Sequence, residues 1–387
     1  GDEPSFGGKA FNLARLGQAG YRVSRGFCIR VGAYDRFLND SELKAFIQME
    51  IGRKPLAEMR WEEIWDAALR IRNRFSLAEV PPDVAQCIWS ATDALGSDAS
   101  LAVRSSAPGE DSVSRSFAGL HESFLHVTGR QAVLDAVRLV WASLWSDAAL
   151  LYRKELALDP LKSQMAVLVQ EMREDSPSGV AFGRDPRTAD NDHAVIEAVP
   201  GLCCNLVDGD VDPDRWVINR SSRGTVQWRS GSRDHAGHNP PLLQQDDLNS
   251  LLDLLDQVES RLGWCPDIEW TGRAERLTVL QARPVTVAAE DADQQRAWHL
   301  TLRPGAAQLG QLCHRVVEQL IPELEATGQR LAAEQLDQLG DPELADRIAG
   351  RQAIVQEWKR IYWDEFIPFA HGVRYLGLYY NDAVRPA

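Results

Sequence analysis

The spacing of apolar residues along the chain predicts helices and strands up to about residue 287. Apolar residues recur at helical spacing in five stretches, over residues 32–51, 61–75, 82–95, 130–158 and 246–262. Short apolar runs bounded by turn-forming residues predict strands at 101–104, 124–127, 165–172, 179–183, 194–199, 215–219 and 225–228.

Two further runs predict a β-hairpin that carries polar side chains among apolar ones. Asp267–Trp270 and Leu277–Val287 flank a short polar stretch containing Gly272, as the two strands of a hairpin do. Period-two alternation in the second run predicts one face made of Leu277, Val279, Gln281, Arg283 and Val285. Glu269 and Gln281 both carry odd numbers, so pairing across an odd-length loop puts them on the same face.

A carboxylate, an amide and a guanidinium close together suit a magnesium-bound polyphosphate. Oxygen atoms of Glu269 and Gln281 are the ligands that the hard cation prefers, and Arg283 can meet phosphate oxygens. On these residues alone, a surface hairpin with ordinary polar side chains is the simpler alternative.

Two further cations lie where a phosphate could be bound. Lys9 follows Gly7-Gly8 at the start of a helical repeat, and the amide groups at a helix start favour anions. Arg104 ends a strand beside a Ser/Gly loop at residues 105–111. A simple turn and a salt bridge to a nearby acid are the respective alternatives.

The composition is that of an ordinary soluble protein of more than one domain. The chain has 387 residues, of which 44% are hydrophobic and 25% charged, and this length exceeds one usual hydrophobic core. Its 42 basic and 56 acidic residues give a net charge of −14, which argues against nucleic acid or an anionic membrane as a partner. No apolar stretch is long enough to span a bilayer. The six cysteines show no CxxC spacing, and we expect reduced thiols in a cytoplasmic protein.

An ordered series of motifs resembles a known family. The segments GGKAFNLARL, LAVRSSAPGED, SFAGLHESFLHV, VLVQEM, PDRWVI and DIEW followed by LQARP resemble the ATP-binding region of the phosphoenolpyruvate synthase (pyruvate, water dikinase) and pyruvate phosphate dikinase family. Rifamycin phosphotransferases and glucan, water dikinases share that region. The resemblance covers roughly residues 5–287, and 298–387 look like the helical segment of synthase-like members.

The resemblance implies an α+β fold, with an ATP-grasp nucleotide-binding domain of two subdomains followed by an all-helical segment. We expect subdomain 1 at residues 1–160, subdomain 2 at 161–287, a linker at 288–297 and an incomplete helical segment at 298–387. The aromatic-rich end of that helical segment suggests packing against a further part of the protein.

The resemblance also implies roles for particular residues. Catalytic positions would be Lys9, Arg104 and Arg283, which match phosphate contacts. The loop around Gly119 resembles a cover over the phosphates. The strand end that reads adenine would consist of Gln170, Glu171 and Met172. Magnesium ligands would be Glu269 and Gln281.

In the family, the ATP β-phosphate passes to a histidine on a separate domain and then to an acceptor, releasing AMP and phosphate. Magnesium and cationic side chains suit that chemistry. None of the eight histidines lies in a glycine-rich Ser/Cys-His segment, so we expect the phosphohistidine domain elsewhere, in the same full-length protein or on a separate chain. A pyruvate-like acceptor would be reached through it. The chain also has Gly201-Leu202-Cys203-Cys204 where the family usually has Gly-Leu-Gly-Glu.

Three functions stay open at this point. The chain is the ATP-binding part of a phosphoenolpyruvate synthase-like phosphotransferase, a fragment of a rifamycin-type antibiotic phosphotransferase, or a non-catalytic ATP-binding regulatory module. The sequence does not reveal the final acceptor, the oligomeric state, the native length, or the effect of Cys203-Cys204 on ATP turnover.

Overall fold

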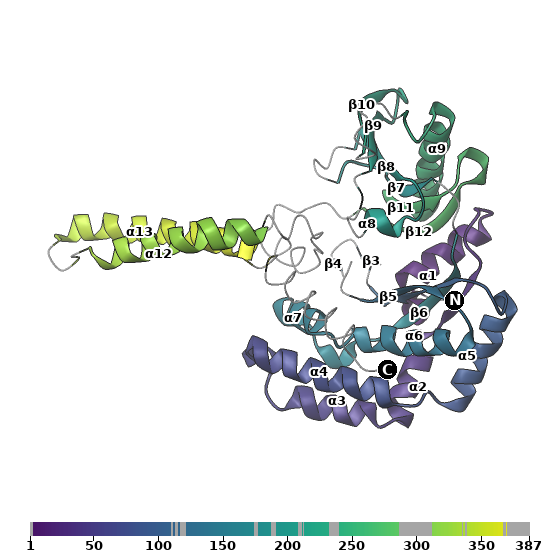
Figure 1. Cartoon of the computed structure of the whole chain (residues 1–387), viewed down its shortest axis with the longest axis horizontal. Coiled ribbons are helices and arrows are strands. Elements are labelled where there is room, and N and C mark those ends of the chain that lie inside the picture. Colours follow the sequence, from purple (N-terminus) through teal and green to yellow (C-terminus); the bar gives the residue numbers. More distant parts are fainter. Residues whose placement is uncertain are drawn as a thin grey trace. The chain divides into compact units, whose positions relative to one another are not determined.

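The chain divides into two units, Gly1–Ala289 and Glu290–Ala387. The computed structural model describes residues 3–109, 111–112, 115–116, 121–173, 177–186, 191–207, 211, 213–231, 240–285, 312–334, 336, 339–366 and 369. The first unit combines helices with antiparallel sheets, and the described residues of the second are helical (Figure 1). The expected α+β class is confirmed.

The first unit alternates helices and strands along its length. Its described helices are α1 (Glu3–Gln18), α2 (Val31–Asp40), α3 (Leu43–Gly52), α4 (Trp61–Leu77), α5 (Pro82–Leu95), α6 (Arg130–Ser143), α7 (Asp147–Glu155), α8 (Cys204–Val207) and α9 (Gln245–Leu262), with short 3-10 turns at Leu56–Glu58, Pro160–Lys162 and Ala274–Arg276. Its described strands are β1 (Gly26–Ile29), β2 (Leu101–Ser106), β3 (Asp111–Ser112), β4 (Arg115–Ser116), β5 (Ser123–Val127), β6 (Ala166–Glu171), β7 (Ser178–Phe182), β8 (His193–Val199), β9 (Asp214–Asn219), β10 (Thr225–Arg229), β11 (Pro266–Thr271) and β12 (Thr278–Pro284).

A four-stranded antiparallel sheet in the order β1-β6-β2-β5 packs against a layer of helices. Phe37 of α2 stacks on Trp141 of α6 with 5.1 Å between ring centroids and meets Phe75 of α4 edge-on at 5.7 Å. All three rings are fully buried. Because large aromatic side chains bury much apolar surface, this cluster holds the helical layer together.

A six-stranded antiparallel sheet in the order β10-β9-β8-β7-β11-β12 follows, and α9 covers one of its faces. The buried residues of α9 recur every three or four positions, as a helix with one apolar face requires. On the sheet side, the same core contains Ala181, Ile196, Trp216, Ile218 and Ile268. Their neighbours along each strand point to the opposite face.

Helix α1 contacts both sheets. It packs Leu13 and Leu16 into the core beneath the six-stranded sheet, and its buried Asn12 Nδ2 donates to the Ala282 carbonyl of β12 at 3.1 Å. At its start, Gly7 has φ 71° and ψ 163°, outside the helical region. The predicted glycine turn is therefore confirmed, and it lies at a kink within α1.

Two predicted helices are each divided in the structure. The stretch 130–158 breaks between α6 and α7, where the Ser146 side chain accepts a hydrogen bond from the Ala149 amide and starts a new helix. The stretch 32–51 breaks between α2 and α3, where Glu42 has a left-handed φ of 58°. Apolar periodicity continued across both breaks, so it did not reveal them.

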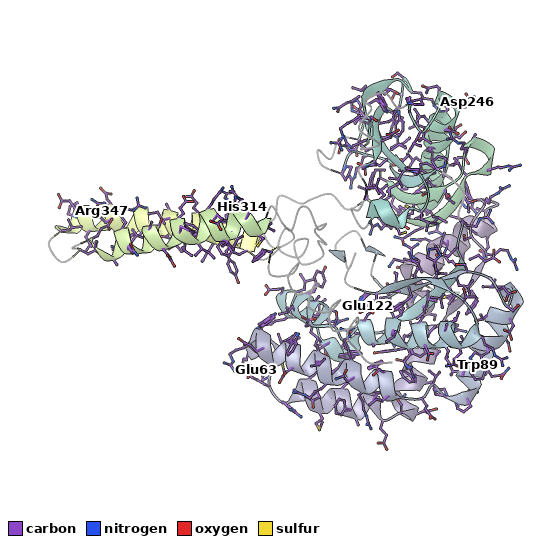
Figure 2. The ribbon with its side chains drawn as sticks, in the orientation of Figure 1. Glu63, Trp89, Glu122, Asp246, His314 and Arg347 are labelled. Carbon is purple, nitrogen blue, oxygen red and sulfur yellow. The ribbon has the colours of Figure 1, made fainter. Side chains whose placement is uncertain are left out.

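The described part of the second unit is helical. It contains α12 (Ile321–Ala332), α13 (Asp341–Ile361) and two π-helical segments, η4 (Val316–Leu320) and η6 (Tyr362–Phe366). Arg351 of α13 pairs with Glu334 at 3.0 Å and donates to the Leu331 carbonyl, and Arg347, labelled in Figure 2, approaches Glu334 at 3.7 Å. A cation beside the carbonyl groups of the last turn stabilises the C-terminal end of α12.

The expected boundaries at residues 160, 287 and 297 stay predictions. Strand β6, which follows residue 160, pairs with β1 and β2 of the four-stranded sheet. In the part of the chain that the structure describes, no helix has the length and apolar character needed to cross a membrane.

The close approach of Gly7 to Ser106 gives a test of how α1 is seated. A Cβ at Gly7 would collide with the Ser106 backbone carbonyl, and the positive φ adds strain. Gly7→Ala should lower the free energy of unfolding by ~2–5 kcal/mol, the sum of left-handed strain and overpacking. Chemical denaturation measures this loss.

Gly20→Ala is the matched control, because Gly20 also has a positive φ of 91° but nothing within 4 Å of an added Cβ. Its free energy of unfolding should fall by only about 1–2 kcal/mol, the cost of the left-handed strain alone. Equal losses in the two variants would contradict a tight contact between α1 and β2.

Candidate functional site

The β11–β12 hairpin gathers four polar residues on one face. Glu269 lies directly opposite Gln281, and Asp267 directly opposite Arg283. Directly opposed residues of antiparallel strands share a face, so these side chains form one polar cluster. The prediction that Glu269 and Gln281 share a face is confirmed. Asp267 was left out of the predicted site, although its alternation with Glu269 would have included it.

A register shift in the hairpin changes which apolar residues share this face. The ladder shifts between Glu269 and Trp270, so Val279 pairs with Trp270. Val279 and Leu277 then pack with the core beneath the sheet. The predicted alternation was wrong for Leu277 and Val279, because one extra residue in a strand turns the side chains beyond it to the other face.

Arg104 brings the four-stranded sheet to this cluster. Its Nη2 lies 2.8 Å from Glu269 Oε2, and the two side chains are 18% and 12% exposed. Burial alone would raise the pKa of Glu269, but the Arg104 guanidinium, helped by Arg283 and Lys9, outweighs it and holds the pKa below the ordinary 4.5. Glu269 is therefore ionised at neutral pH.

Arg283 pairs with Asp267 on the same hairpin. Its Nε donates to Asp267 Oδ2 at 2.7 Å. Burial raises the pKa of Asp267 above its ordinary 3.8, an effect that Arg283 offsets only in part and that the charge of Glu269 increases. The two carboxylates of the cluster are thus pushed in opposite directions.

The turn at Gly7 brings Lys9 to the polar cluster, where its charge acts on Glu269. The Ala10 amide donates to Ser106 Oγ at 3.1 Å, and Lys9 Nζ lies 3.4 Å from Ser105 Oγ. These contacts hold the start of α1 against the end of β2, just beyond Arg104. Ser105 and Ser106 belong to the LAVRSSAPGED motif, but the sequence did not predict that they position Lys9 and α1.

The end of β6 is tied to its surroundings by backbone hydrogen bonds. The Glu171 amide donates to the Arg25 carbonyl and the Met172 amide to the Ser100 carbonyl, both at 2.8 Å. The Gln170 side chain donates to the Leu280 carbonyl of β12 at 3.2 Å. The structure therefore places this strand end beside β12, and its predicted contact with adenine stays a prediction. Gly119 lies outside the described residues.

The donor set suits a magnesium ion that is held mainly by a bound polyphosphate. The Oε1 atom of Gln281 is buried and has no hydrogen-bond partner, and Gln281 lies directly opposite the ionised Glu269 on the neighbouring strand. Within the described ranges, no three His, Cys, Asp or Glu residues form a group that could hold a metal. Magnesium commonly takes one or two protein oxygens and completes its shell with phosphates and water, which fits this pair.

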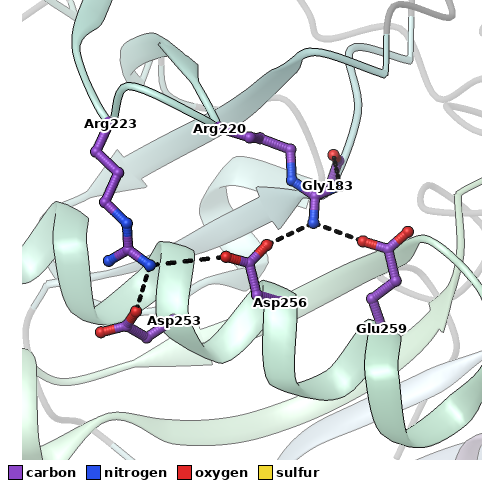
Figure 3. A network of polar contacts seen from close by, with 6 residues as sticks. All are labelled: Gly183, Arg220, Arg223, Asp253, Asp256 and Glu259. Atoms are coloured by element: carbon purple, nitrogen blue, oxygen red, sulfur yellow. Dashed lines mark hydrogen bonds and ion pairs between the residues drawn. The ribbon is translucent and has the colours of Figure 1, made fainter.

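A network of ion pairs fixes the strand end next to the cluster. Figure 3 shows its members, which are Gly183, Arg220, Arg223, Asp253, Asp256 and Glu259. Arg220 donates to the Gly183 carbonyl at 3.0 Å while holding Asp256 and Glu259 of α9 at 2.5 and 2.6 Å. The Gly183 amide donates to the Pro266 carbonyl at 2.8 Å. The end of β7 is thereby fixed beside the start of β11, where Asp267 lies.

Comparison with known proteins identifies the family. Residues 3–303 match the family described as pyruvate phosphate dikinase, AMP/ATP-binding domain. The chain belongs to this family.

Relatives of this pyruvate phosphate dikinase-type domain carry different names. The phosphoenolpyruvate synthase of Aeropyrum pernix is 32% identical over 345 residues, covering 76% of this chain and 42% of the synthase. The prodigiosin synthesizing transferase of Serratia marcescens is 33% identical over 303 residues, covering 74% and 32%. A rifampicin phosphotransferase of Streptomyces sviceus is 32% identical over 323 residues, covering 78% and 37%. The chain spans less than half the length of these relatives.

The departure at Cys203-Cys204 lies at the polar cluster of this pyruvate phosphate dikinase-type domain. Cys203 is buried, and its Sγ lies 3.3 Å from the Gly179 carbonyl of β7. Burial raises the pKa of its thiol, and the nearby charge of Glu269 adds to this while Arg104 opposes it. Cys203 is therefore a neutral thiol beside the ion pair of the site.

The opposite pKa shifts of the two carboxylates predict opposite responses to acid. The pKa of Glu269 is lowered by folding, so its contribution to stability is present above the ordinary 4.5 and is lost as pH falls through the lowered value. Glu269→Gln should lower the free energy of unfolding by ~1–3 kcal/mol at pH 7. That loss should shrink below pH 4.5 in denaturant titrations.

Asp267→Asn is the matched control. Folding raises the pKa of Asp267, so Asp267 takes up a proton more readily in the native state than in the unfolded state. The free energy of unfolding of the wild type should therefore rise relative to that of the variant as pH falls. If the stability difference between wild type and Glu269→Gln and that between wild type and Asp267→Asn change with pH in the same direction, the assigned ionisation of the cluster is wrong.

Proposed function

We propose that the first unit binds magnesium–ATP in an ATP-grasp cleft and serves as the ATP-binding part of a phosphoenolpyruvate synthase-like phosphotransferase. The observation that carries this proposal is the contact between Arg104 of the four-stranded sheet and Glu269 of the six-stranded sheet. It brings cations and oxygen ligands from distant parts of the sequence to one point. The family membership supports ATP as the ligand.

Each polar residue of the cluster then has a role. Glu269 and Gln281 would hold the magnesium ion, which supplies charge neutralisation at the phosphates when bound. Lys9, Arg104 and Arg283 bind phosphate oxygens, and a guanidinium can do so with two parallel hydrogen bonds. Gln170, Glu171, Met172 and the loop around Gly119 would contact adenine and cover the phosphates.

Binding exchanges ion pairs without leaving a buried charge unpaired. Without nucleotide, Arg104 neutralises Glu269 and Arg283 neutralises Asp267. With the ligand present, each arginine turns to a phosphate, and the carboxylates face the cation. This exchange matters because an unpaired buried charge costs several kcal/mol.

The reaction would end on a part of the protein beyond this sequence. We infer that the β-phosphate passes to a histidine on a swivelling domain, in the same full-length protein or on another chain, and from there to a pyruvate-like acceptor. Positioning and charge neutralisation are what this chain contributes to phosphoryl transfer. Its short coverage of the relatives supports a role as one part of a larger enzyme.

Two further proposals accompany this function. The four-stranded sheet with its helices would be one ATP-grasp subdomain and the six-stranded sheet with α9 the other, followed by the linker and the helical segment. All six cysteines are thiols that form no disulfide, which supports the cytoplasm as the compartment.

ATP binding should depend on both magnesium and the hairpin oxygens. In calorimetry, the wild type should bind ATP in the presence of Mg²⁺. The double variant Glu269→Ala/Gln281→Ala should bind it about a hundredfold more weakly or not at all, since losing even an outer partner of a metal site costs about 10–100-fold in affinity.

Asp246→Ala/Gln257→Ala is the matched control, because both residues are exposed on α9, which covers the other face of the sheet. It should bind ATP as the wild type does. Unchanged ATP binding in the Glu269/Gln281 variant would show that the site assignment is wrong.

Transfer can be followed with ATP labelled at the β-phosphate. Mixed with the histidine domain of a phosphoenolpyruvate synthase, the chain should yield labelled phosphohistidine and AMP. Lys9→Ala and Arg104→Ala should each lower the rate by about 10²–10³-fold, the cost of removing one preorganised charge-stabilising group. ATP binding without any transfer to an intact histidine domain would favour a non-catalytic nucleotide-binding module, which the Cys203-Cys204 departure also suggests.

A second candidate is antibiotic phosphotransfer, favoured by the rifampicin phosphotransferase relatives. The helical second unit would then begin a hydrophobic acceptor pocket. Saturable binding of rifampicin, measured by calorimetry with the whole chain, would favour this function over the synthase-like one.

A further inference from the structure

A second charged group lies on the six-stranded sheet, outside the hairpin. Arg215 of β9 approaches Glu197 of β8 at 3.2 Å between Nε and Oε1, and its Nη2 lies 3.7 Å from Asp185. The three side chains are only 12%, 21% and 13% exposed. Arg215 belongs to the PDRWVI motif.

The strand register puts Glu197 on the same face as the polar cluster. Glu269 of β11 is opposite Val180 of β7, Val180 is opposite Glu197, and Glu197 is opposite Arg215. Because directly opposed residues share a face, all four point away from the core that α9 covers. Two strand spacings separate Glu269 from Glu197, or about 10 Å.

The ion pair orients the Glu197 carboxylate but contacts only one of its two oxygen atoms. Arg215 contacts Oε1 of Glu197, and Arg215 Nε makes no well-directed hydrogen bond. A partly buried ion pair of this kind adds little net stability, because desolvation offsets the attraction. Glu197 lies instead on the same face as the proposed nucleotide site, where a carboxylate can serve in binding.

The charge of Glu197 decides which part of a nucleotide it can meet. A carboxylate accepts hydrogen bonds and repels phosphate, so its natural partner is a hydroxyl group. In an extended nucleotide whose outer phosphates lie at Glu269, Gln281 and Arg283, the α-phosphate and the C5′ methylene lead on to the ribose. Two strand spacings correspond to that separation.

We propose that Glu197 accepts hydrogen bonds from the ribose hydroxyls of the nucleotide and that Arg215 is its positioning residue. The inference rests on the proposed binding of magnesium–ATP and extends it from the phosphates to the sugar. It makes this site selective for ribonucleotides over deoxyribonucleotides.

Calorimetry with ATP, 2′-deoxy-ATP and 3′-deoxy-ATP in the presence of Mg²⁺ tests the proposal. The wild type should bind ATP about ten- to hundredfold more tightly than at least one deoxy analogue, as expected for a hydrogen bond to a charged acceptor. Glu197→Ala should reduce this ratio to about one by weakening ATP binding alone. Arg215→Lys should lower the ratio partway.

Controls separate recognition of ribose from a purely structural role. Glu197→Gln keeps the shape and one acceptor oxygen, so it should fold as the wild type does and show an intermediate ratio. Asp246→Ala removes an exposed carboxylate from α9, which covers the other face of the sheet, and should leave the ratio unchanged. Thermal unfolding of each variant accompanies the titrations.

The possible failures are distinguishable. If the wild type binds ATP and discriminates against a deoxy analogue, but Glu197→Ala and Glu197→Gln keep the full ratio, the ribose contact is wrong while the proposed function stands. Absence of discrimination in a wild type that binds ATP also overturns the inference alone. If the folded wild type binds no ATP, the proposed function fails and the inference fails with it.

Discussion

The ion pair between Arg104 and Glu269 joins the two sheets, although these two residues lie 165 positions apart in the chain. Both side chains are largely buried, and neither charge would tolerate that environment without the other. Arg104 also keeps Glu269 ionised against the effect of burial. The remaining polar groups of the site, Lys9 and the hairpin residues, are arranged around this pair, and the same charges are available to a phosphate and a metal ion.

Helix α1 allows the two sheets to meet at that point. It packs Leu13 and Leu16 into the core beneath the six-stranded sheet, while its first turn lies against Ser106 of the four-stranded sheet. Gly7 makes this approach possible because a side chain would collide with the β2 backbone. The glycine turn, which the sequence predicted before Lys9, therefore also fixes the relation between the sheets.

The six-stranded sheet separates its tasks by face. Alternate residues of its central strands form the apolar core with α9, and the others bring Glu197, Asp267 and Glu269 to the opposite side. The register shift in the hairpin lets β12 keep Val279 in the core and Gln281 among the polar groups. Cys203 lies beside these charges as a neutral thiol.

The sequence by itself determined the α+β class, the hairpin and the residue types of the site. Alternation within Asp267–Trp270 and the glycine turn before Lys9 depend on neighbours in the chain, and local geometry is enough to predict them. The breaks at Glu42 and Ser146 were missed because apolar periodicity is the same on either side of a turn.

Only the tertiary structure decided which charges meet. Arg104 was equally compatible with a local salt bridge, and nothing in its surrounding sequence pointed to Glu269. The ionisation of Asp267 and Glu269, the orphan oxygen of Gln281 and the row from Glu269 to Glu197 all depend on burial and strand register. These properties arise between segments far apart in the chain, so no local pattern can fix them.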